Sequence, residues 1–150
     1  MADKQIGDFT LSGTGGPFRL SACPARSLVL FFYPKDNTPG CTQEGTAFGA
    51  LHEEFRRLDC DVYGVSRDSL KSHHNFKARH GFPFELLSDE DESLCQMFGV
   101  IRMKNMYGRQ VRGIERSTFV LDAQRTIRRE WRGVKVPGHA QEVLDFVKTL

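Results

Sequence analysis

The chain has 150 residues, enough for one domain that buries an apolar core without needing disulfides or metal ions. Hydrophobic residues make up 39% of it and charged residues 27%, a composition typical of soluble globular proteins. The net charge of +2 does not select a class of partner. No repeat, linker or low-complexity tract divides the sequence. We therefore expect a single domain over residues 1–150.

Neither a targeting signal nor a membrane segment is visible in the sequence. The first residues, MADKQIGDF, contain no apolar signal core, and the longest apolar run, LVLFFY at 28–33, is far too short to cross a bilayer. A cytoplasmic location, with no membrane partner, is the resulting expectation. The cysteines lie far apart, in no metal-ligand spacing, which argues against a zinc site or a secreted disulfide scaffold. They are Cys23, Cys41, Cys60 and Cys95, and we expect them to be reduced thiols.

The first third of the chain predicts a hairpin, a buried strand and a helix. Residues 8–20 predict a short hairpin, because DFTLSG and PFRL flank a glycine-rich turn. The apolar run SLVLFFYP, 27–34, predicts a central strand that is buried on both faces and ends at Pro34. Apolar residues recur at helical spacing over 41–58, which predicts a helix with Cys41 in its first turn.

The middle of the chain continues the alternation of strands and helices. The segment CDVYGVS, 60–66, predicts a second buried strand, and SLKSHHNFKARHG, 69–81, predicts a helix closed by its last glycine. FELLS, 84–88, predicts a short strand.

The last third predicts a helix, a hairpin and a final helix. SDEDESLCQMFG, 88–99, predicts a helix with Ser88 or Asp89 as its N-cap. RSTFVLDAQRTIRREW, 116–131, predicts an antiparallel hairpin, and 138–150 has the apolar spacing of a helix. This order of elements predicts an α/β, thioredoxin-like fold: a central mixed sheet flanked by helices, with an N-terminal β-hairpin.

Positive charge is concentrated in one stretch. Residues 101–135 contain ten of the 21 Lys and Arg residues and three acidic residues. One interpretation is a nucleic-acid patch. The other is the solvated faces of strands and loops, together with one or two arginines of a site. Because no aromatic-interleaved or known binding motif accompanies the charges, we expect no nucleic-acid partner.

Cys41 has sequence neighbours that suit a reactive thiol. A cysteine becomes a nucleophile when it is deprotonated, and the first turn of a helix favours negative charge through its unpaired N–H groups and dipole. Pro39 and Gly40 suit the entry into such a turn, and Thr38 could place its hydroxyl beside the sulfur. On spacing alone, Cys41 could equally be a small buried apolar residue.

The string PKDNTPGCTQE, 34–44, resembles the peroxiredoxin active-site motif Pro-x-x-x-Thr-x-x-Cys, in the form found in the bacterioferritin comigratory protein or peroxiredoxin Q subfamily. The likeness covers nearly the whole chain. It includes GVSRDSLKSHHNF (64–76), LLSDED (86–91), KNMYGRQVRGIERSTFVLD (104–122) and the closing helix. A cysteine is common in thioredoxin-fold proteins, whereas Pro, Thr and Cys at this spacing together with a distant GIERSTF segment are not, so the match is specific.

The resemblance implies a thiol-dependent peroxidase that reduces hydrogen peroxide and organic hydroperoxides. Carried over residue by residue, Cys41 is the peroxidatic nucleophile, Thr38 hydrogen-bonds the thiolate and the peroxide, Pro34 shields the pocket from water, and Arg116 brings its guanidinium to the sulfur. Glu44 either orients Arg116 or complements the helix dipole. Nothing in the sequence asks for a metal, haem or flavin cofactor, and because the resembled subfamily is often monomeric we expect a monomer.

The route back from the oxidised thiol departs from the subfamily pattern. Peroxide turns Cys41 into a sulfenic acid, which a thiol must reduce. In the subfamily the resolving cysteine, when present, lies five residues after the peroxidatic one or in the helix that corresponds to 69–81. Those positions hold Thr46 and Lys77 here. We therefore expect a one-cysteine cycle in which an external thiol (glutathione, glutaredoxin or thioredoxin) supplies the electrons.

Two alternatives stay open. The first is an internal disulfide from Cys41 to another cysteine, with Cys95 as the resolving residue, which requires the two Cα atoms to come within about 7 Å. The second is a redox sensor or chaperone, a binding module that uses Cys41 as a switch. A disulfide oxidoreductase is disfavoured because the chain contains no C-x-x-C.

Overall fold

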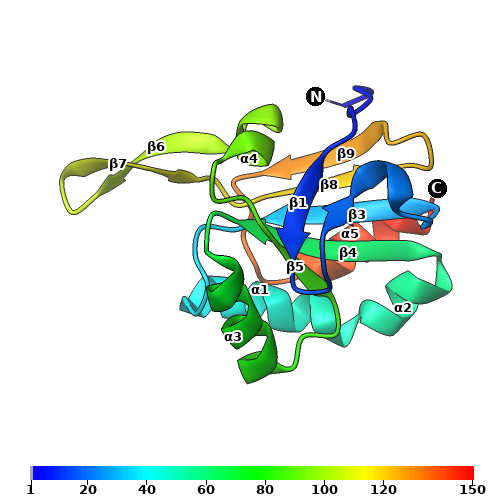
Figure 1. Cartoon of the computed structure of the whole chain (residues 1–150), viewed down its shortest axis with the longest axis horizontal. Coiled ribbons are helices and arrows are strands. Elements are labelled where there is room, and N and C mark those ends of the chain that lie inside the picture. Colours follow the sequence, from blue (N-terminus) through cyan, green and yellow to red (C-terminus); the bar gives the residue numbers. More distant parts are fainter. Residues whose placement is uncertain (1) are drawn as a thin grey trace.

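The computed structural model describes residues 2–150, and a mixed sheet of seven strands runs through the middle of the molecule (Figure 1). The strands are β1 (Thr10–Gly13), β2 (Phe18–Arg19), β3 (Ser27–Phe32), β4 (Cys60–Ser66), β5 (Glu85–Ser88), β8 (Ser117–Leu121) and β9 (Ile127–Arg132). Across the sheet their order is β2-β1-β5-β4-β3-β8-β9. The hairpin predicted over 8–20 is formed by β1 and β2, and the hairpin predicted over 116–131 is formed by β8 and β9.

Strand β3 is buried along its whole length, as its apolar run predicts. It pairs in parallel with β4 on one side and antiparallel with β8 on the other. Successive side chains of a strand point to opposite faces. Leu28, Leu30 and Phe32 therefore belong to the core on one face of the sheet, and Val29 and Phe31 belong to the core on the other.

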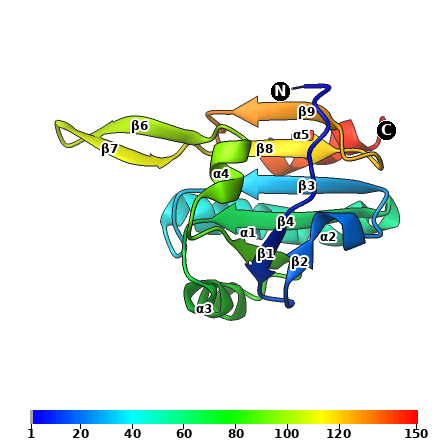
Figure 2. The same ribbon diagram turned by 45° about the horizontal axis from the view of Figure 1, so that its top comes forward.

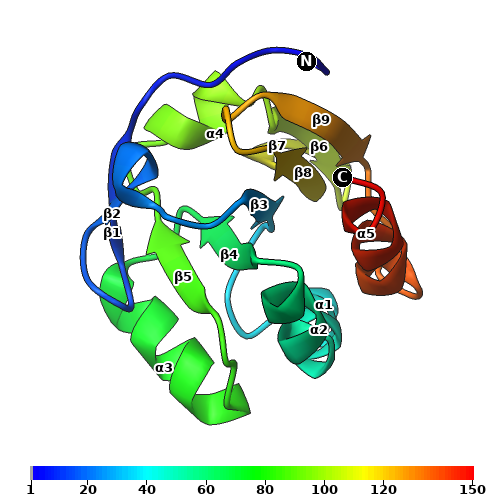
Figure 3. The same ribbon diagram turned by 90° about the vertical axis from the view of Figure 1, so that its right-hand side faces the viewer.

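Helices cover both faces of the sheet, as Figures 2 and 3 show. They are α1 (Pro39–Ala50), α2 (His52–Arg57), α3 (Leu70–His80), α4 (Ser93–Met97) and α5 (His139–Val147), with a 3₁₀ turn at Leu20–Ala22. Residues of α1, α2, α3 and α5 share the core with Val29 and Phe31, whereas α4 packs on the opposite face. Within residues 2–150 the structure contains no helix with the length and hydropathy needed to span a membrane.

The single helix predicted over 41–58 is wrong, because the structure contains two helices there. Helix α1 ends at Ala50 and α2 begins at His52, with Leu51 between them at φ −102° and ψ 4°. The apolar spacing does not reveal the break, because Phe48 of α1 and Phe55 of α2 are buried in the same core. The helical spacing of buried residues therefore continues although the helix is interrupted at Leu51.

Helix α3 follows its sequence signals closely. The Ser69 hydroxyl accepts a hydrogen bond from the backbone N–H of Ser72 at 3.1 Å and so caps the first turn. Gly81 closes the helix in the left-handed region at φ 64°. Predictions based on caps succeed here because the caps are local.

The helix predicted to begin at Ser88 or Asp89 starts later, at Ser93. Asp89 is fully buried, and its carboxylate accepts hydrogen bonds from the backbone N–H groups of Leu94 and Cys95, at 3.0 and 2.7 Å. The Asp89 carboxylate therefore accepts hydrogen bonds from the first turn of α4, although Asp89 precedes the helix by several residues. The intervening turn, which includes Glu92 at φ 64°, was not foreseen.

Two strands outside the main sheet were also not predicted. β6 (Ile101–Met106) and β7 (Arg109–Ile114) form a separate two-stranded sheet that projects from the body of the molecule (Figures 1 and 2). Most of their residues are exposed. The sequence signal for a strand is a buried face with period two, and these strands have none.

Substitution of Gly45 tests how tightly α1 packs on the aromatic core. A Cβ atom at Gly45 would lie 2.5 Å from Cζ of Phe82, whose ring stacks on Phe84. We expect Gly45→Ala to lower the free energy of unfolding by about 1 to 3 kcal/mol, despite the better helix propensity of alanine. Denaturant unfolding measures the effect. Thr46→Ala, at the exposed neighbouring position, should change stability by less than about 0.5 kcal/mol; equal stabilities of the two variants would contradict the close packing.

Candidate active site

Cys41 lies in the first turn of α1, directly after the loop that follows β3. Thr38 is the N-cap residue, Pro39 is the first helical residue, and the backbone N–H of Thr42 makes a helical bond to the Thr38 carbonyl at 2.9 Å. The Cys41 side chain is buried, with 2% of its surface exposed. N–H groups in the first turn lack carbonyl partners inside the helix, so they favour negative charge on a group placed there.

Arg116 reaches the same sulfur from a distant part of the chain. It lies between β7 and β8, and its Nη2 donates to Cys41 Sγ at 3.3 Å. Its Nη1 donates to Glu44 Oε1 at 2.7 Å, one turn further along α1. A single guanidinium therefore holds both the thiol and the carboxylate. Of the two possibilities that the sequence left open for Glu44, this contact corresponds to orienting Arg116.

Glu44 is a buried carboxyl group with an incomplete set of partners. Its side chain is 1% exposed, and its Oε2 has no hydrogen-bond partner within residues 2–150. Burial raises the pKa of Glu44 from 4.5 to about 7, although Arg116 pulls it downward. Burial lowers the pKa of Arg116, but Glu44 and Cys41 more than offset this, so that the guanidinium stays charged.

The structure places Thr38 and Pro34 in the same loop as the start of α1. Both are partly buried. The Thr38 hydroxyl donates to the Lys35 carbonyl at 2.8 Å, which leaves its oxygen lone pairs free to accept a hydrogen bond. Of the four residues that the resemblance selects, the structure thus brings Arg116 into contact with Cys41, while Thr38 bonds within its own loop.

Sequence reasoning missed the anchor of this loop. The side chain of Asp36 is buried, and it accepts hydrogen bonds from Tyr33 Oη at 2.6 Å and from Ser72 Oγ at 2.8 Å. His73 Nδ1 lies 2.8 Å from the same carboxylate, while His73 Nε2 donates to the Leu87 carbonyl at 3.0 Å. These bonds fix the loop before Cys41 to α3. Asp36 lies inside the matched string, but nothing in the sequence indicates its partners.

Asp36, Asp68 and His73 also bring three potential metal-ligand atoms within 4.8 Å of one another. Hydrogen bonds account for this proximity. Asp68 accepts from Ser66 Oγ at 2.5 Å and from the backbone N–H of Asp36 at 3.0 Å. Because the Leu87 carbonyl can only accept, His73 Nε2 is the donor of that bond, and Nδ1 faces Asp36.

More cations gather at the base of the β6–β7 hairpin, beside the site. Arg67 donates to Glu92 at 2.8 Å, and Arg112 donates to the same carboxylate. Lys104 donates from Nζ to the Ile114 carbonyl, and burial together with Arg116 lowers its pKa. Arg67 is therefore bound to Glu92.

The other three cysteines lie away from Cys41. Cys95 is fully buried, in the core on the opposite face of the sheet from Cys41. Cys60 starts β4 opposite Ser27, at the end of the sheet far from Cys41, roughly 20 Å away along the strand. Cys23 is half-buried in a loop near the same end. Burial raises the pKa of all three thiols, for Cys60 to about 12, which makes them poor nucleophiles.

Lys77 and Thr46 have different environments. Lys77 lies in α3, and its ammonium donates to the carbonyls of Phe82 and Phe84, at 2.8 Å each. It thereby ties the helix to the segment that leads into β5. Thr46 is exposed on α1.

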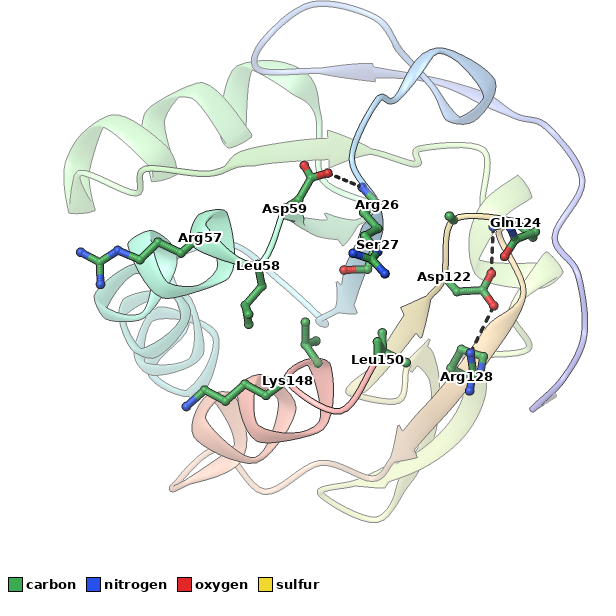
Figure 4. Close-up of a pocket in the computed structure, with 12 residues that line it drawn as sticks. Arg26, Ser27, Arg57, Leu58, Asp59, Asp122, Gln124, Arg128, Lys148 and Leu150 are labelled. Atoms are coloured by element: carbon green, nitrogen blue, oxygen red, sulfur yellow. Dashed lines mark hydrogen bonds and ion pairs between the residues drawn. The ribbon is translucent and has the colours of Figure 1, made fainter.

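One cavity lies well away from Cys41. A cavity of about 640 Å³ lies at the opposite end of the sheet, where β3 begins and β8 ends (Figure 4). Its two acids are already engaged: Asp59 accepts from the backbone N–H of Arg26, and Asp122 pairs with Arg128. Cys41 is not among the residues that line this cavity.

Comparison with known proteins agrees with this arrangement. Residues 2–130 match the family described as AhpC/TSA. Peroxiredoxin Bcp of Xanthomonas campestris is 54% identical over 142 residues (94% of this chain, 89% of that protein), and the Bacillus subtilis protein of the same name is 43% identical over 144 residues (95% and 92%).

Solved structures agree as well. Peroxiredoxin Q of X. campestris superposes with a TM-score of 0.89 at 54% identity, covering 94% of this chain and 90% of that one. PrxQ of Xylella fastidiosa superposes with a TM-score of 0.94 at 45% identity, covering 99% and 96%. The X. campestris protein has also been solved as two variants, each with a different cysteine replaced by serine. The sequence separation between those two cysteines equals the separation between Cys41 and Lys77 in this chain.

A thioredoxin-like fold with a thiol at a helix start and an arginine on its sulfur defines a class of thiol-dependent proteins. The chain belongs to the AhpC/TSA family, and within it to the peroxiredoxins of the Bcp or Q type, which are thiol peroxidases. The family resemblance and the fold class predicted from the sequence are both confirmed.

The raised pKa of Glu44 predicts how stability depends on pH. The folded state holds this proton up to about pH 7, whereas the unfolded chain releases it near 4.5. The stability that the protonated carboxyl provides is therefore lost as pH rises through that window. Glutamine cannot ionise. We expect the free energy of unfolding of Glu44→Gln, relative to wild type, to rise by about 2 to 3 kcal/mol between pH 5 and pH 8.

Denaturant unfolding at the two pH values measures this difference. Glu54→Gln, at an exposed position of α2, is the matched control and should show no such trend. A difference between Glu44→Gln and wild type that is the same at both pH values would contradict a buried, protonated Glu44.

Proposed function

We propose that Cys41 is the peroxidatic nucleophile and that the protein reduces hydrogen peroxide and organic hydroperoxides. The observation that carries the proposal is the contact of Arg116 Nη2 with Cys41 Sγ, 3.3 Å long, at the first turn of α1. A solved structure of the X. campestris bacterioferritin comigratory protein was described for its alkyl peroxide reduction activity, which supports organic hydroperoxides as substrates.

The chemical step moves charge from sulfur to oxygen. The Cys41 thiolate attacks one peroxide oxygen, the S–O bond forms, and the O–O bond breaks. The leaving oxygen takes a proton and departs as water or an alcohol, and Cys41 is left as a sulfenic acid. Donors already fixed around the reacting atoms stabilise the charge that develops on the leaving oxygen. Arg116 suits this role, because it remains charged and its orientation is fixed by Glu44.

Thr38 and Pro34 complete the proposed site. Because the Thr38 hydroxyl donates to the Lys35 carbonyl, its oxygen is available to accept the O–H of a peroxide and to orient the molecule toward the sulfur. Pro34 lies at the start of the same loop and offers no N–H to water. Asp36, bonded to α3, holds the loop in position.

Peroxidase kinetics test the assignment of the nucleophile and of Arg116. Cys41→Ser should abolish peroxide consumption coupled to a thiol. Arg116→Ala should slow the second-order oxidation of Cys41 by peroxide by about a hundredfold, because a positioned donor to the transition state is lost. Quenched-flow mass spectrometry of the oxidised protein measures that rate. Arg128→Ala removes an arginine at the opposite end of the sheet and should react like wild type. An unchanged rate in Arg116→Ala would remove Arg116 from the mechanism.

We also propose a one-cysteine cycle, in which an external thiol reduces the sulfenic acid. A first external thiol condenses with Cys41–SOH, so that a mixed disulfide forms and water leaves. A second external thiol then attacks this mixed disulfide, which releases reduced Cys41 and joins the two external thiols in a disulfide. Thr46 and Lys77 at the two resolving positions support this proposal, as does the burial of Cys95 across the sheet from Cys41. Glutathione, glutaredoxin and thioredoxin are the candidate reductants.

Thiol mapping after one equivalent of peroxide tests the cycle. In wild type we expect sulfenic acid on Cys41 and no internal disulfide in non-reducing mass spectrometry. A disulfide from Cys41 to Cys95, Cys60 or Cys23 would overturn the one-cysteine cycle.

The variant Lys77→Cys provides the positive control for the same experiment. It restores a thiol at the spacing found in the X. campestris relative, so we expect an internal disulfide between Cys41 and the introduced thiol. Its yield should depend on Cys41, and Thr46→Ser should leave the outcome as in wild type.

Residues 1–150 are proposed to act as one peroxiredoxin domain, as a monomer, in the cytoplasm. The seven-stranded sheet, with one core on each face, supports the first of these statements. A redox sensor that uses Cys41 as a switch would show stoichiometric oxidation but no turnover with any of the three reductants.

A further inference from the structure

The hairpin of β6 and β7, residues 101–114, is the part of the molecule that the proposed chemistry leaves unexplained. We call it the arm. It forms its own two-stranded sheet and extends away from the main sheet, as Figures 1 and 2 show. Strand β7 ends at Ile114, two residues before Arg116, so the base of the arm adjoins the reactive thiol.

Exposed apolar side chains are concentrated on the arm. Six large apolar side chains are exposed within residues 2–150, and four of these belong to it. The four are Met103 (61% exposed), Met106 (48%), Tyr107 (99%) and Val111 (39%). A cluster of apolar groups held in water is typical of a surface that another molecule covers. Methionine and tyrosine are also common at protein interfaces.

One face of the arm alternates apolar and cationic side chains. Opposite residues in an antiparallel pair point to the same side, and the register pairs Lys104 with Val111 and Met106 with Arg109. These four side chains therefore share a face, which we call the docking face. The arm contains four Lys or Arg residues and no Asp or Glu. Lys104 connects this face to the site, because its Nζ donates to the Ile114 carbonyl.

We propose that the docking face binds the protein thiol that reduces Cys41, a partner whose surface around its own cysteine combines acidic and apolar residues. This inference rests on the proposed one-cysteine cycle. The reductant must bring a thiol to a sulfur that is almost fully buried, and the arm begins beside that sulfur. Carboxylates of the partner would meet Lys104 and Arg109, and its apolar residues would cover Met106 and Val111.

Other occupants fit the docking face less well. A nucleic acid would neutralise Lys104 and Arg109 but would leave Met106 and Val111 uncovered. The arm of a second copy would bring the same positive charges against this face. An acidic and apolar protein surface satisfies both kinds of side chain at once.

The reaction at this interface is thiol exchange. The thiol of the docked partner first gives up its proton, and its thiolate attacks Cys41–SOH, so that the S–S bond forms and the S–O bond breaks. The hydroxyl group of the sulfenic acid takes up that one proton and leaves as water. A second thiol of the partner then attacks the mixed disulfide, releases reduced Cys41 and leaves the partner oxidised. The two electrons come from the partner.

Steady-state peroxidase kinetics test the proposal. Two protein thiols, thioredoxin and glutaredoxin, serve as reductants, and the small thiol dithiothreitol serves as the comparison that needs no docking face. The variants are the double substitution Met106→Ser with Val111→Ser, and the charge reversal Arg109→Glu. We expect kcat/KM for at least one protein reductant to fall about tenfold or more in both variants. Turnover with dithiothreitol, and the rate of Cys41 oxidation by hydrogen peroxide, should stay within about twofold of wild type. Added salt should weaken the protein reductant in wild type more than in Arg109→Glu.

Matched controls lie at the opposite end of the molecule. Leu150→Ser removes an apolar side chain with the same 39% exposure as Val111, and Arg57→Glu reverses an exposed charge. Both should use the protein reductants like wild type. The proposal is overturned if the arm variants also use the protein reductants like wild type, or if their turnover with dithiothreitol falls as much as their turnover with the protein reductants. It is also overturned if neither protein reductant supports turnover of the wild type.

Two further measurements identify other occupants, and either positive result with unchanged reductant kinetics overturns the proposal. Salt-dependent binding of a DNA duplex that is lost in Arg109→Glu would assign the face to nucleic acid. A change of sedimentation coefficient in the arm variants would assign it to a second copy of the chain. Oxidation of Cys41 by peroxide, measured without any reductant, is independent of the arm. If peroxide does not oxidise Cys41, the proposed peroxidase chemistry itself is refuted. If peroxide oxidises Cys41 and the protein reductants act on the arm variants as on wild type, only the docking face is refuted.

Discussion

The register between β3 and β8 is the constraint on which the site depends. Phe32 at the end of β3 pairs with Ser117 at the start of β8, so the chain that leaves β3 toward α1 passes the residue just before Ser117. That residue is Arg116. A slip of one position would turn its side chain to the other face of the sheet and away from Cys41. The antiparallel pairing therefore brings together two functional groups that lie 75 residues apart in sequence.

Burial gives the site its electrostatic character. Arg116 bonds both Cys41 and Glu44, yet the second oxygen of Glu44 has no partner within the described part of the chain. The free energy lost when the carboxylate is removed from water exceeds the free energy gained from its one contact with a guanidinium, so the pKa of Glu44 rises to about 7. The guanidinium is then shared between a thiol and a carboxyl group that is partly protonated near neutral pH. This leaves more of its positive charge for the sulfur.

Helix α3 links the loop before Cys41 to the rest of the fold. Its first turns hold Asp36 through Ser72 and His73, and Lys77 near its end holds the carbonyls of Phe82 and Phe84. A resolving cysteine at position 77 would have to leave this packed position to meet Cys41. Lysine there instead adds two hydrogen bonds that keep the helix in place. A reductant that approaches from outside, along the arm, is consistent with such a fixed helix.

The sequence by itself determined the features that depend on neighbouring residues. These are the buried strand β3, the helix start at Cys41, the caps of α3 at Ser69 and Gly81, and the turn between β8 and β9. The active-site motif is also local, which is why the family could be identified from it. The sequence marked Arg116 only through that resemblance, since nothing near it in the chain indicates a thiol partner.

Tertiary structure alone decided the rest. The bonds of Glu44 with Arg116 and of Asp36 with His73 join residues 72 and 37 positions apart, and periodicity and caps carry no information about such pairs. The break at Leu51 is hidden because both helices bury the same face. The arm has no buried face to produce a pattern. Local signals therefore placed Cys41, and long-range packing decided what surrounds it.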